Sequence, residues 1–378
     1  MSRRVMFTAA PGAGHVFPMI PLAWALRAAG HEVLLVTGGR GLAAAAKSGL
    51  PFADHAPAMT GQEVSDHITR QFPAHLPSAG SRILNLTEAA ERVCHIARFG
   101  VDETVRIAEH WRPDLVVHDP LNVAGPVCGA KFHVPAVQHL WGFVRTAGLA
   151  AELHRLLGDD FERNGAAGLP EATAVLDVAP PGMLTGEPEG WSLRYVPHNG
   201  AGALPDWLLD SAPPRRPRIA VTLGTEVSVG SGLSIFTRIA QAAEEVDADF
   251  VFAVGADPAE LGPLPPNVRA ERWLPFNALL ARCSAALHHG GAGTTMTTLA
   301  AGLPQLLLPC NADQFANSTA VADRGAGLIG DVTDIDPGLL TQLVENDKLR
   351  ENAAEVRAEI TAMPTPAAVA ARLRTLTG

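Results

Sequence analysis

The sequence predicts an α/β protein made of two Rossmann-like, doubly wound domains, each with a parallel sheet. Three observations support this fold class. Short apolar runs alternate with helical segments in both halves of the chain, as in right-handed βαβ units. Between the halves, Val196–Pro217 is rich in proline and glycine and contains the run PPRRP, a composition typical of a linker. The length of 378 residues suits two domains of ordinary size better than one.

These observations predict where the parts of the chain begin and end. We expect an N-terminal domain over residues 1–212, a linker over residues 213–217 and a C-terminal domain over residues 218–363. Residues 364–378 include a short helical segment that can pack back on the N-terminal domain.

The elements follow in order. In the N-terminal half, the apolar run Arg4–Ala9 predicts a strand, PGAGH predicts a turn, and Val16–Ala29 predicts a helix that Gly30 ends. The other elements predicted there are strand His31–Val36, helix Arg92–Trp111, strand Asp114–His118 and strand Ala136–His139. The elements predicted in the C-terminal half are strand Arg218–Leu223, helix Leu233–Glu245, strands Phe250–Val254, Val268–Trp273 and Ala285–His289, helix Thr294–Ala301 and strand Gln305–Leu308. Residues 54–90 and 139–195 are irregular, and long insertions after strand ends usually form binding regions.

Composition and charge exclude several classes of protein. Hydrophobic residues make up 47% of the chain and charged residues 18%, which suits large buried sheets and argues against disorder. The net charge is −10 and no basic cluster with interleaved aromatic residues occurs, so we expect no nucleic-acid partner. No run of eighteen or more apolar residues is present, so we expect no membrane span.

Metal and disulfide sites are not expected either. The four cysteines are isolated, which fits a reducing, cytoplasmic compartment. The two Asp-x-Asp patterns, Asp247–Asp249 and Asp334–Asp336, fall at an amino-terminal strand edge and in a polar surface segment. Neither pattern has the neighbouring ligands that a metal site needs.

The most informative segment is a glycine-rich elbow in the C-terminal half. Thirty residues from Cys283 to Ala312 contain no Asp, Glu, Lys or Arg, and within them a strand leads through HHGGAGTT into a helix. Free N–H groups and the positive end of a helix favour a diphosphate. Because side chains alternate along a strand, His288 should point into the core and His289 toward a phosphate.

Four further residues could complete a site for a nucleotide and a polyol. Trp273 ends a strand and offers an aromatic surface for a base, Thr225 lies in the first turn of the C-terminal half, and Asp313 with Gln314 follows strand Gln305–Leu308. Each of these residues taken alone is more often structural.

His15 and Asp119 form a candidate catalytic pair. His15 lies in the first strand-to-helix turn, and Asp119 ends the strand Asp114–His118, so both belong to the carboxyl edge of one sheet. A carboxylate bonded to one ring nitrogen leaves the other nitrogen able to accept a proton. Each residue also has a purely structural alternative: His15 as an ordinary surface residue, and Asp119 as a cap of the turn before Pro120.

An NAD-linked oxidoreductase is the first alternative function. The segment GAGHVFP lacks the third glycine of a dinucleotide fingerprint, and no acid follows the second strand, where Val36–Gly39 stands. A Walker A motif is excluded, because no Lys-Ser/Thr pair follows the glycines.

Three long segments together resemble a known family. They are PGAGHVFPMIPLAWALRAAGHEV, RPDLVVHDP, and the stretch from RWLPFNALLARC to LPCNADQFANS. The chain resembles the family 1 nucleotide-sugar glycosyltransferases of the GT-B fold, and within them the bacterial branch that attaches deoxysugars to polyketides, enediynes and other secondary metabolites. Two further alternatives within this resemblance are a GT-B sugar-nucleotide epimerase and a catalytically silent auxiliary protein.

The resemblance implies roles for individual residues. It makes His15 the general base and Asp119 its orienting acid, in an inverting transfer that needs no metal. It assigns the nucleotide and its diphosphate to Thr225, Trp273, Leu274, His289, Gly291, Ala292, Gly293 and Thr294, and the sugar to Asp313 and Gln314.

Two departures from the family pattern bear on the substrates. Relatives that use UDP-sugars have a Glu for the ribose diol where this chain has Thr297, and plant relatives that use UDP-glucose have Gln where it has Phe276. We therefore expect a TDP-sugar as co-substrate, with no cofactor. The expected acceptor is a hydrophobic small-molecule aglycone, and the residues that could line its pocket, or instead belong to the core, are Met59, Phe72, Trp141 and Phe143. A homodimer is compatible with the sequence.

Overall fold

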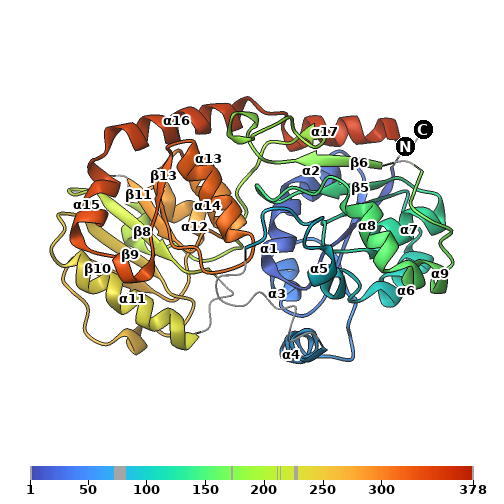
Figure 1. Cartoon of the computed structure of the whole chain (residues 1–378), viewed down its shortest axis with the longest axis horizontal. Coiled ribbons are helices and arrows are strands. Elements are labelled where there is room, and N and C mark those ends of the chain that lie inside the picture. Colours follow the sequence, from blue (N-terminus) through green and yellow to red (C-terminus); the bar gives the residue numbers. More distant parts are fainter. Residues whose placement is uncertain are drawn as a thin grey trace.

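The computed structural model consists of two lobes, each built around a parallel sheet (Figure 1). It describes residues 2–71, 82–171, 173–210, 212, 214–224 and 229–376. We call the part around the first sheet the N-terminal lobe and the part around the second sheet the C-terminal lobe. The α/β fold class predicted from the sequence is confirmed.

The N-terminal lobe has a doubly wound sheet in the order β3-β2-β1-β4-β5-β6-β7, and every described pair of strands in it is parallel. Its strands are β1 (Arg4–Thr8), β2 (Glu32–Thr37), β3 (Phe52–Asp54), β4 (Leu115–His118), β5 (Ala136–His139), β6 (Thr173–Asp177) and β7 (Trp191–Ser192). Its helices are α1 (Ala13–Val16), α2 (Ile20–Ala28), α3 (Gly41–Lys47), α4 (Gly61–Gln71), α5 (Ala90–Ala97), α6 (Val101–Trp111), α7 (Ala124–Phe132), α8 (Leu149–Leu156) and α9 (Gly158–Arg163), with α10 (Asp206–Leu209) in the following connection.

The C-terminal lobe repeats this topology, with the order β10-β9-β8-β11-β12-β13 and parallel pairing. Its strands are β8 (Arg218–Thr222), β9 (Asp249–Ala253), β10 (Val268–Glu271), β11 (Ala285–His288), β12 (Gln305–Leu307) and β13 (Gly327–Ile329). Its helices are α11 (Val229–Ala243), α12 (Phe276–Leu280), α13 (Ala292–Ala301), α14 (Gln314–Asp323), α15 (Pro337–Glu345) and α16 (Asp347–Ala362).

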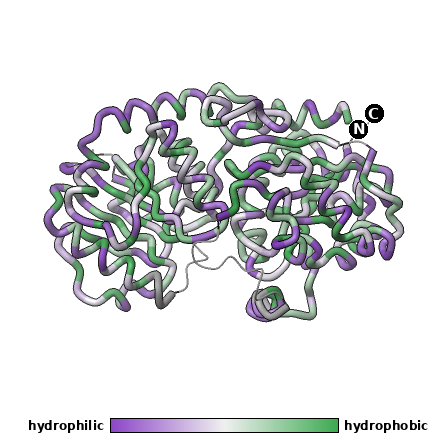
Figure 2. Tube along the Cα trace, in the orientation of Figure 1, coloured by the Kyte–Doolittle hydropathy of each residue, from purple (hydrophilic) through white to green (hydrophobic). Residues whose placement is uncertain are grey.

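The core of each lobe is the sheet with the helix faces that cover it. Central strands such as β4 and β11 are buried along their whole length, which is why they appear in the sequence as apolar runs without alternation. The hydrophobic segments lie toward the centre of each lobe, while α16 on the outside is largely hydrophilic (Figure 2).

Some predicted elements differ from those observed. The single helix expected over residues 92–111 is two helices, α5 and α6, because Gly100 has φ +75° and interrupts the helical path. The short strands β3, β6, β7 and β13 were not predicted, since two to five residues carry too little periodicity to be recognised.

The end of the chain connects the lobes. Helix α16 runs over the C-terminal lobe toward the N-terminal lobe, and α17 (Pro366–Leu373) packs on α2 of the N-terminal lobe, where Val369 and Leu373 share a core with Leu22 and Leu26 (Figure 1). The N–H of Arg194 donates to the carbonyl of Pro364 and secures this crossing. The expected limits of residues 1–212, 213–217 and 218–363 stay a prediction.

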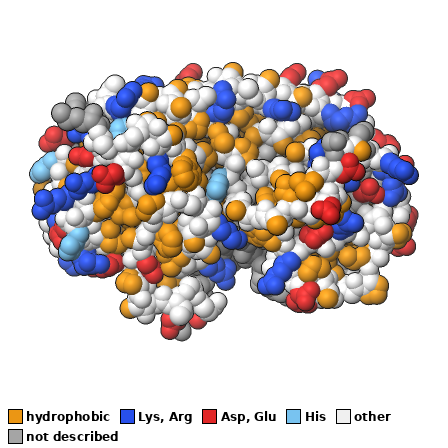
Figure 3. Space-filling model, turned by 180° about the vertical axis from the view of Figure 1, so that it is seen from behind, with side chains coloured by type: hydrophobic (Ala, Val, Ile, Leu, Met, Phe, Trp, Pro, Cys, Tyr) orange, Lys and Arg blue, Asp and Glu red, His pale blue; other side chains and the backbone are white. Residues whose placement is uncertain are grey.

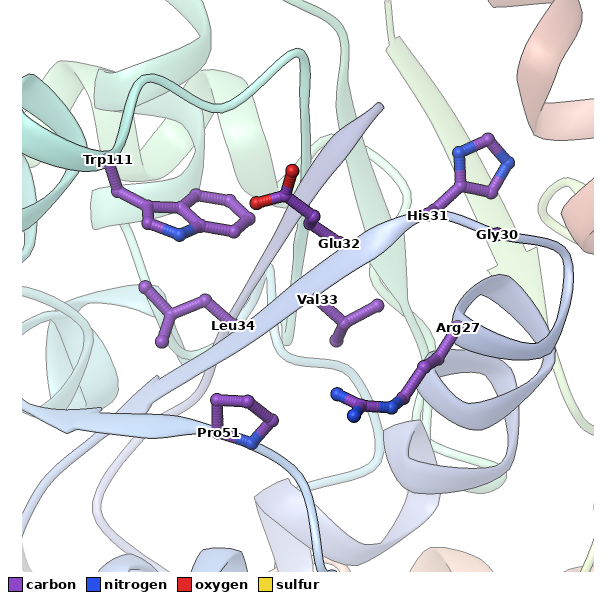
Figure 4. Close-up of a pocket in the computed structure, with 8 residues that line it drawn as sticks. All are labelled: Arg27, Gly30, His31, Glu32, Val33, Leu34, Pro51 and Trp111. Carbon is purple, nitrogen blue, oxygen red and sulfur yellow. The ribbon is translucent and has the colours of Figure 1, made fainter. Parts of the chain in front are cut away.

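On the face shown in Figure 3, Lys and Arg side chains are mixed with Asp and Glu, and hydrophobic atoms lie between them. None of the described helices has both the length and the apolar character that crossing a membrane requires. A shallow pocket lies where β2 begins, lined by residues such as Arg27, His31 and Trp111 (Figure 4). It sits at the amino-terminal edge of the first sheet, opposite the edge that carries His15.

Candidate active site

Both sheets reverse their strand order at a point where ligands usually bind in doubly wound folds. In the first sheet this point lies between β1 and β4, and in the second between β8 and β11. The segments that leave β1 and β4 carry His15 and Asp119, and the segment that leaves β11 carries His289. Topology therefore places the predicted base and the predicted diphosphate elbow at equivalent positions in the two lobes.

His15 and Asp119 lie together. The Nδ1 atom of His15 is 3.3 Å from Oδ1 of Asp119, and the side chains are 25% and 1% exposed. Asp119 also accepts hydrogen bonds from the N–H of Ala10 at 2.6 Å and of Leu121 at 2.7 Å. These main-chain donors hold the carboxylate still, so that it can orient the imidazole. The indole of Trp141 contacts the His15 ring edge-on, with centroids 4.9 Å apart.

The glycine elbow opens helix α13. Gly291 is its N-cap and supplies no side-chain cap, and the N–H of Ala292 in the first turn is bonded to the carboxyl group of Asp313. The positive end of this helix favours an anion. The imidazole of His289 is enclosed by two glycines: a Cβ atom would come within 2.4 Å of His289 Cε1 at Gly224 and within 2.3 Å of Nε2 at Gly291. Burial lowers the pKa of His289 to about 4, which leaves the ring neutral at pH 7. Nδ1 of this ring has no hydrogen-bond partner among the described residues.

His288 is a core residue, as predicted. Its Nε2 lies 2.7 Å from Oε1 of Gln305, and its Nδ1 accepts the N–H of Gly290 at 3.1 Å. An accepting Nδ1 and a donating Nε2 define a neutral tautomer, and burial lowers the pKa of His288 to about 3.

Trp273 is the exposed aromatic surface that the sequence indicated, at 38% exposure. The ammonium group of Lys47, from the N-terminal lobe, lies 4.0 Å from its ring centroid. Leu274 is instead buried, in a core cluster with Phe276, so its side chain belongs to the core.

The side chains of Asp313 and Gln314 have different hydrogen-bond partners. Asp313 Oδ2 accepts a hydrogen bond from Asn317 at 2.9 Å, and burial raises the pKa of Asp313 while Asn317 and the charge of His15 oppose that shift. Gln314 uses its carboxamide within its own loop, because Oε1 accepts the N–H of Cys310 at 2.9 Å and Nε2 donates to Asn311 at 3.0 Å. In this conformation Gln314 shapes the loop that carries Asp313.

Thr297 is enclosed by the segment that joins the lobes. Its side chain is 1% exposed, and its hydroxyl donates to the carbonyl of Gly293 at 2.6 Å. Tyr195 Oη and Asn199 Nδ2 each lie 3.3 Å from the same hydroxyl. Sequence reasoning missed both residues, because Asn199 lies in the stretch with linker composition and Tyr195 ends the irregular segment before it. That Tyr195 is the single tyrosine of the chain was the available signal.

The four residues expected to line an acceptor pocket differ in burial and location. Trp141 is half-buried beside His15, and Met59 is half-buried in the turn before α4. Phe143 is buried in the main core cluster, which favours a packing role over a pocket role. Phe72 and Thr225 lie outside the described residues.

The two lobes meet at this site. A Cβ atom on Gly142, in the loop after β5, would lie 2.9 Å from Cβ of Ala292 at the start of α13. The N–H of Ile83 donates to the carbonyl of Ala312 at 3.0 Å. Ala312 has φ +51°, a strained value for alanine that this contact helps to maintain. The loops beside His15 and the loops beside the elbow are therefore in direct contact.

No group of three or more His, Cys, Asp or Glu within the described ranges is arranged to hold a metal ion. The Asp247–Asp249 pattern binds a guanidinium instead, with Arg216 at 3.4 Å and 2.8 Å from the two carboxylates.

Comparisons with known proteins point to one family. Residues 24–224 match the N-terminal domain, and residues 237–376 the C-terminal domain, of the family described as erythromycin biosynthesis protein CIII-like. The chain is 41% identical over 383 residues to the elloramycin glycosyltransferase ElmGT of Streptomyces olivaceus, covering 99% of this chain and 98% of that one. The solved structure of the glycosyltransferase SnogD from Streptomyces nogalater is similar with a TM-score of 0.86 and 37% identity over 100% of both chains. The Streptomyces sp. SF2575 glycosyltransferase SsfS6, complexed with thymidine diphosphate, has a TM-score of 0.82 and 26% identity over 99% of both chains.

Proposed function

Because the chain belongs to the erythromycin biosynthesis protein CIII-like family of glycosyltransferases, with the GT-B fold, we propose that it transfers a deoxysugar from a TDP-sugar to a hydroxyl group of a hydrophobic natural product. The observation that carries the proposal is the His15–Asp119 pair beside the interlobe contact at Ala292. Because this family consists of glycosyltransferases, membership in it argues against the alternative function of an NAD-linked oxidoreductase.

Two observations support a TDP-sugar as the donor. SsfS6 is a relative solved with thymidine diphosphate. In this chain Thr297, enclosed by Tyr195, leaves no carboxylate at the position that binds a ribose diol in UDP-using relatives. A 2′-deoxyribose has no such diol to satisfy.

The proposed mechanism is a direct displacement with inversion. His15 takes the proton of the acceptor hydroxyl through its second ring nitrogen, while Asp119 holds Nδ1. The acceptor oxygen forms a bond to the anomeric carbon from the face opposite the diphosphate. The bond from that carbon to the diphosphate oxygen breaks, and its electron pair leaves with TDP.

The leaving group is stabilised by the elbow. The first-turn N–H groups of α13 and the neutral imidazole of His289 can donate to the diphosphate oxygens. We propose that this donor set replaces a metal ion and that no cofactor takes part. Transfer measured with and without EDTA should then proceed at the same rate, and a loss restored by Mg²⁺ or Mn²⁺ would contradict the metal-independent mechanism.

The donor proposal can be tested by ligand binding and by product formation. TDP should raise the melting temperature more than UDP does, and NAD should leave it unchanged, because only a ligand of the native state stabilises it. A panel of TDP-deoxysugars tested against aromatic and macrocyclic aglycones should then yield a glycoside. Stabilisation by UDP alone, or by NAD, would reject the TDP assignment.

Compartment and assembly are secondary parts of the proposal. The four cysteines form no disulfide, which supports a reducing cytoplasm. A homodimer is compatible with the sequence, and light scattering would measure the oligomeric state.

A further inference from the structure

Asn317 lies where the two lobes meet, and its side chain is bonded to both. It is on α14 and is 0% exposed. Its carboxamide contacts three separate segments: the elbow at Gly290, the acid Asp313, and the loop after β5 at Phe143. A buried carboxamide with all its partners in place is rigid, and moving one partner shifts the others.

Two of the bonds are on the donor side. Nδ2 of Asn317 donates to the carbonyl of Gly290 at 3.0 Å and to Oδ2 of Asp313 at 2.9 Å. Gly290 directly precedes Gly291, the N-cap of α13, so the first bond sets the path of the elbow. The second bond orients the carboxylate that is proposed to face the sugar.

The third bond is on the acceptor side. The N–H of Phe143 donates to Oδ1 of Asn317 at 3.3 Å. Arg145 keeps this loop rigid through the carbonyls of Gly142 at 2.9 Å and Phe143 at 3.0 Å. The same loop carries Trp141, whose ring contacts His15.

The loop after β5 packs closely against the carboxamide of Asn317. A Cβ atom on Gly142 would lie 3.0 Å from Oδ1 of Asn317, so a larger residue at position 142 would displace one of them. Only a carboxamide supplies two N–H donors to the donor side and an acceptor to the loop.

We propose that Asn317 is a positioning residue for sugar transfer, because its carboxamide couples the loop beside His15 to the diphosphate elbow and to Asp313. The inference rests on the proposed function and deepens it. Asn317 does not touch the reacting atoms; it sets the donor at the correct distance from the base.

The test compares N317D and N317A with a matched control, N352D. Asn352 also donates its Nδ2 to a backbone carbonyl, that of Gly325 at 2.9 Å, but on α16, away from the site. We expect kcat of N317D to fall by about ten- to a hundredfold, since buried partners lose their donor. Its Kd for TDP should rise much less than kcat falls, by at most about threefold, because Asn317 bonds to Gly290, the residue before the N-cap, and not to the first-turn N–H groups of α13. N352D should match the wild type in both values.

The pH dependence of kcat distinguishes a positioning role of Asn317 from a general loss of structure. N317D places a second carboxyl beside Asp313, with His15 and Arg145 as the nearby charged groups. At lower pH the two carboxyl groups share a proton, and this restores a hydrogen-bond donor between position 317 and Asp313. The ratio of N317D to wild-type kcat should therefore rise from pH 8 to pH 5.5. A flat ratio, or equal losses of kcat and TDP affinity, would overturn the proposal.

A second measurement does not depend on transfer. Hydrogen exchange of the Phe143 amide with TDP bound should be faster in N317A than in the wild type and unchanged in N352D. Unchanged exchange in N317A would reject the coupling even if the enzyme is active. Absence of any product from wild-type protein, with the exchange difference present, would instead reject the proposed function and leave the coupling supported.

Discussion

His15 Nδ1 lies 3.3 Å from Asp119 Oδ1, and the two residues come from segments that follow neighbouring strands of the first sheet. Two main-chain N–H groups, of Ala10 and Leu121, fix the carboxylate in place. In the proposed mechanism, a fixed carboxylate determines which nitrogen of His15 carries the proton, and the other nitrogen then serves as the base.

Removal of the imidazole should therefore stop transfer without releasing the nucleotide. We expect H15A to reduce kcat by about 10²- to 10⁴-fold, the range typical of a lost general base, with little change in the Kd for TDP. Calorimetric titration with TDP is the control for binding. Near-native turnover of H15A with an unactivated hydroxyl acceptor would contradict the assignment of His15.

The orienting acid should show an additional structural effect. D119A should lose transfer and keep TDP affinity, and it should also lower the free energy of unfolding by about 1–3 kcal/mol, because two buried N–H groups lose their acceptor. Urea unfolding measures the second effect. Unchanged stability would show that the N–H groups of Ala10 and Leu121 find other partners.

Two glycines of the elbow should respond differently to the same change. A Cβ at Gly291 would collide with the His289 ring, whereas one at Gly293 meets no atom within 4 Å. G291A should reduce both stability and TDP affinity. G293A lies inside α13, where alanine is favoured over glycine by up to about 1 kcal/mol, so stability should hold or rise while TDP affinity falls. Full TDP affinity in G293A would mean that the diphosphate does not approach this turn closely.

Thr297 provides a test of donor choice. T297E should shift the preference between UDP and TDP toward UDP, because a carboxylate can accept from both hydroxyls of a ribose. The longer side chain must displace Tyr195 and Asn199, so stability should fall by roughly 1–3 kcal/mol. T297Q has the same size without the charge and serves as the control. Equal UDP/TDP ratios in competition assays of T297E and wild type would refute the ribose argument.

Acid should destabilise the protein through its buried histidines. Burial lowers the pKa of His55, His139 and His289 to about 4 and of His288 to about 3, from an ordinary value of 6.5. Between these values the unfolded chain binds more protons than the native one, so stability is complete above pH 6.5 and falls as the pH drops toward 4.

The expected loss of unfolding free energy on acidification is large enough to measure. Each buried histidine should contribute up to about 1.4 kcal/mol to the loss between pH 7.5 and 5.5, as read from urea unfolding at each pH. H288Q should reduce this slope even if it lowers stability at every pH, and H110Q, on the exposed face of α6, is the matched control. A slope that H288Q leaves unaltered would exclude His288 as a contributor.

By itself the sequence determined the α/β class, the glycine elbow before α13 and the candidates His15, Asp119 and His289. The fold class and the nearness of His15 to Asp119 are confirmed, because they depend on local patterns and on one rule, that parallel strands end at a common edge. The catalytic and binding roles of these residues stay predictions. The same local patterns could not show that Gln314 bonds within its own loop or that Leu274 and Phe143 are buried, since burial depends on neighbours from other segments.

Only the tertiary structure decided how the lobes meet. The contacts of Asn317 with Phe143, of Tyr195 with Thr297 and of Ile83 with Ala312 join residues far apart in the chain. Such contacts depend on how two preformed surfaces fit together, and neither hydrophobic period nor turn composition within one segment carries that information.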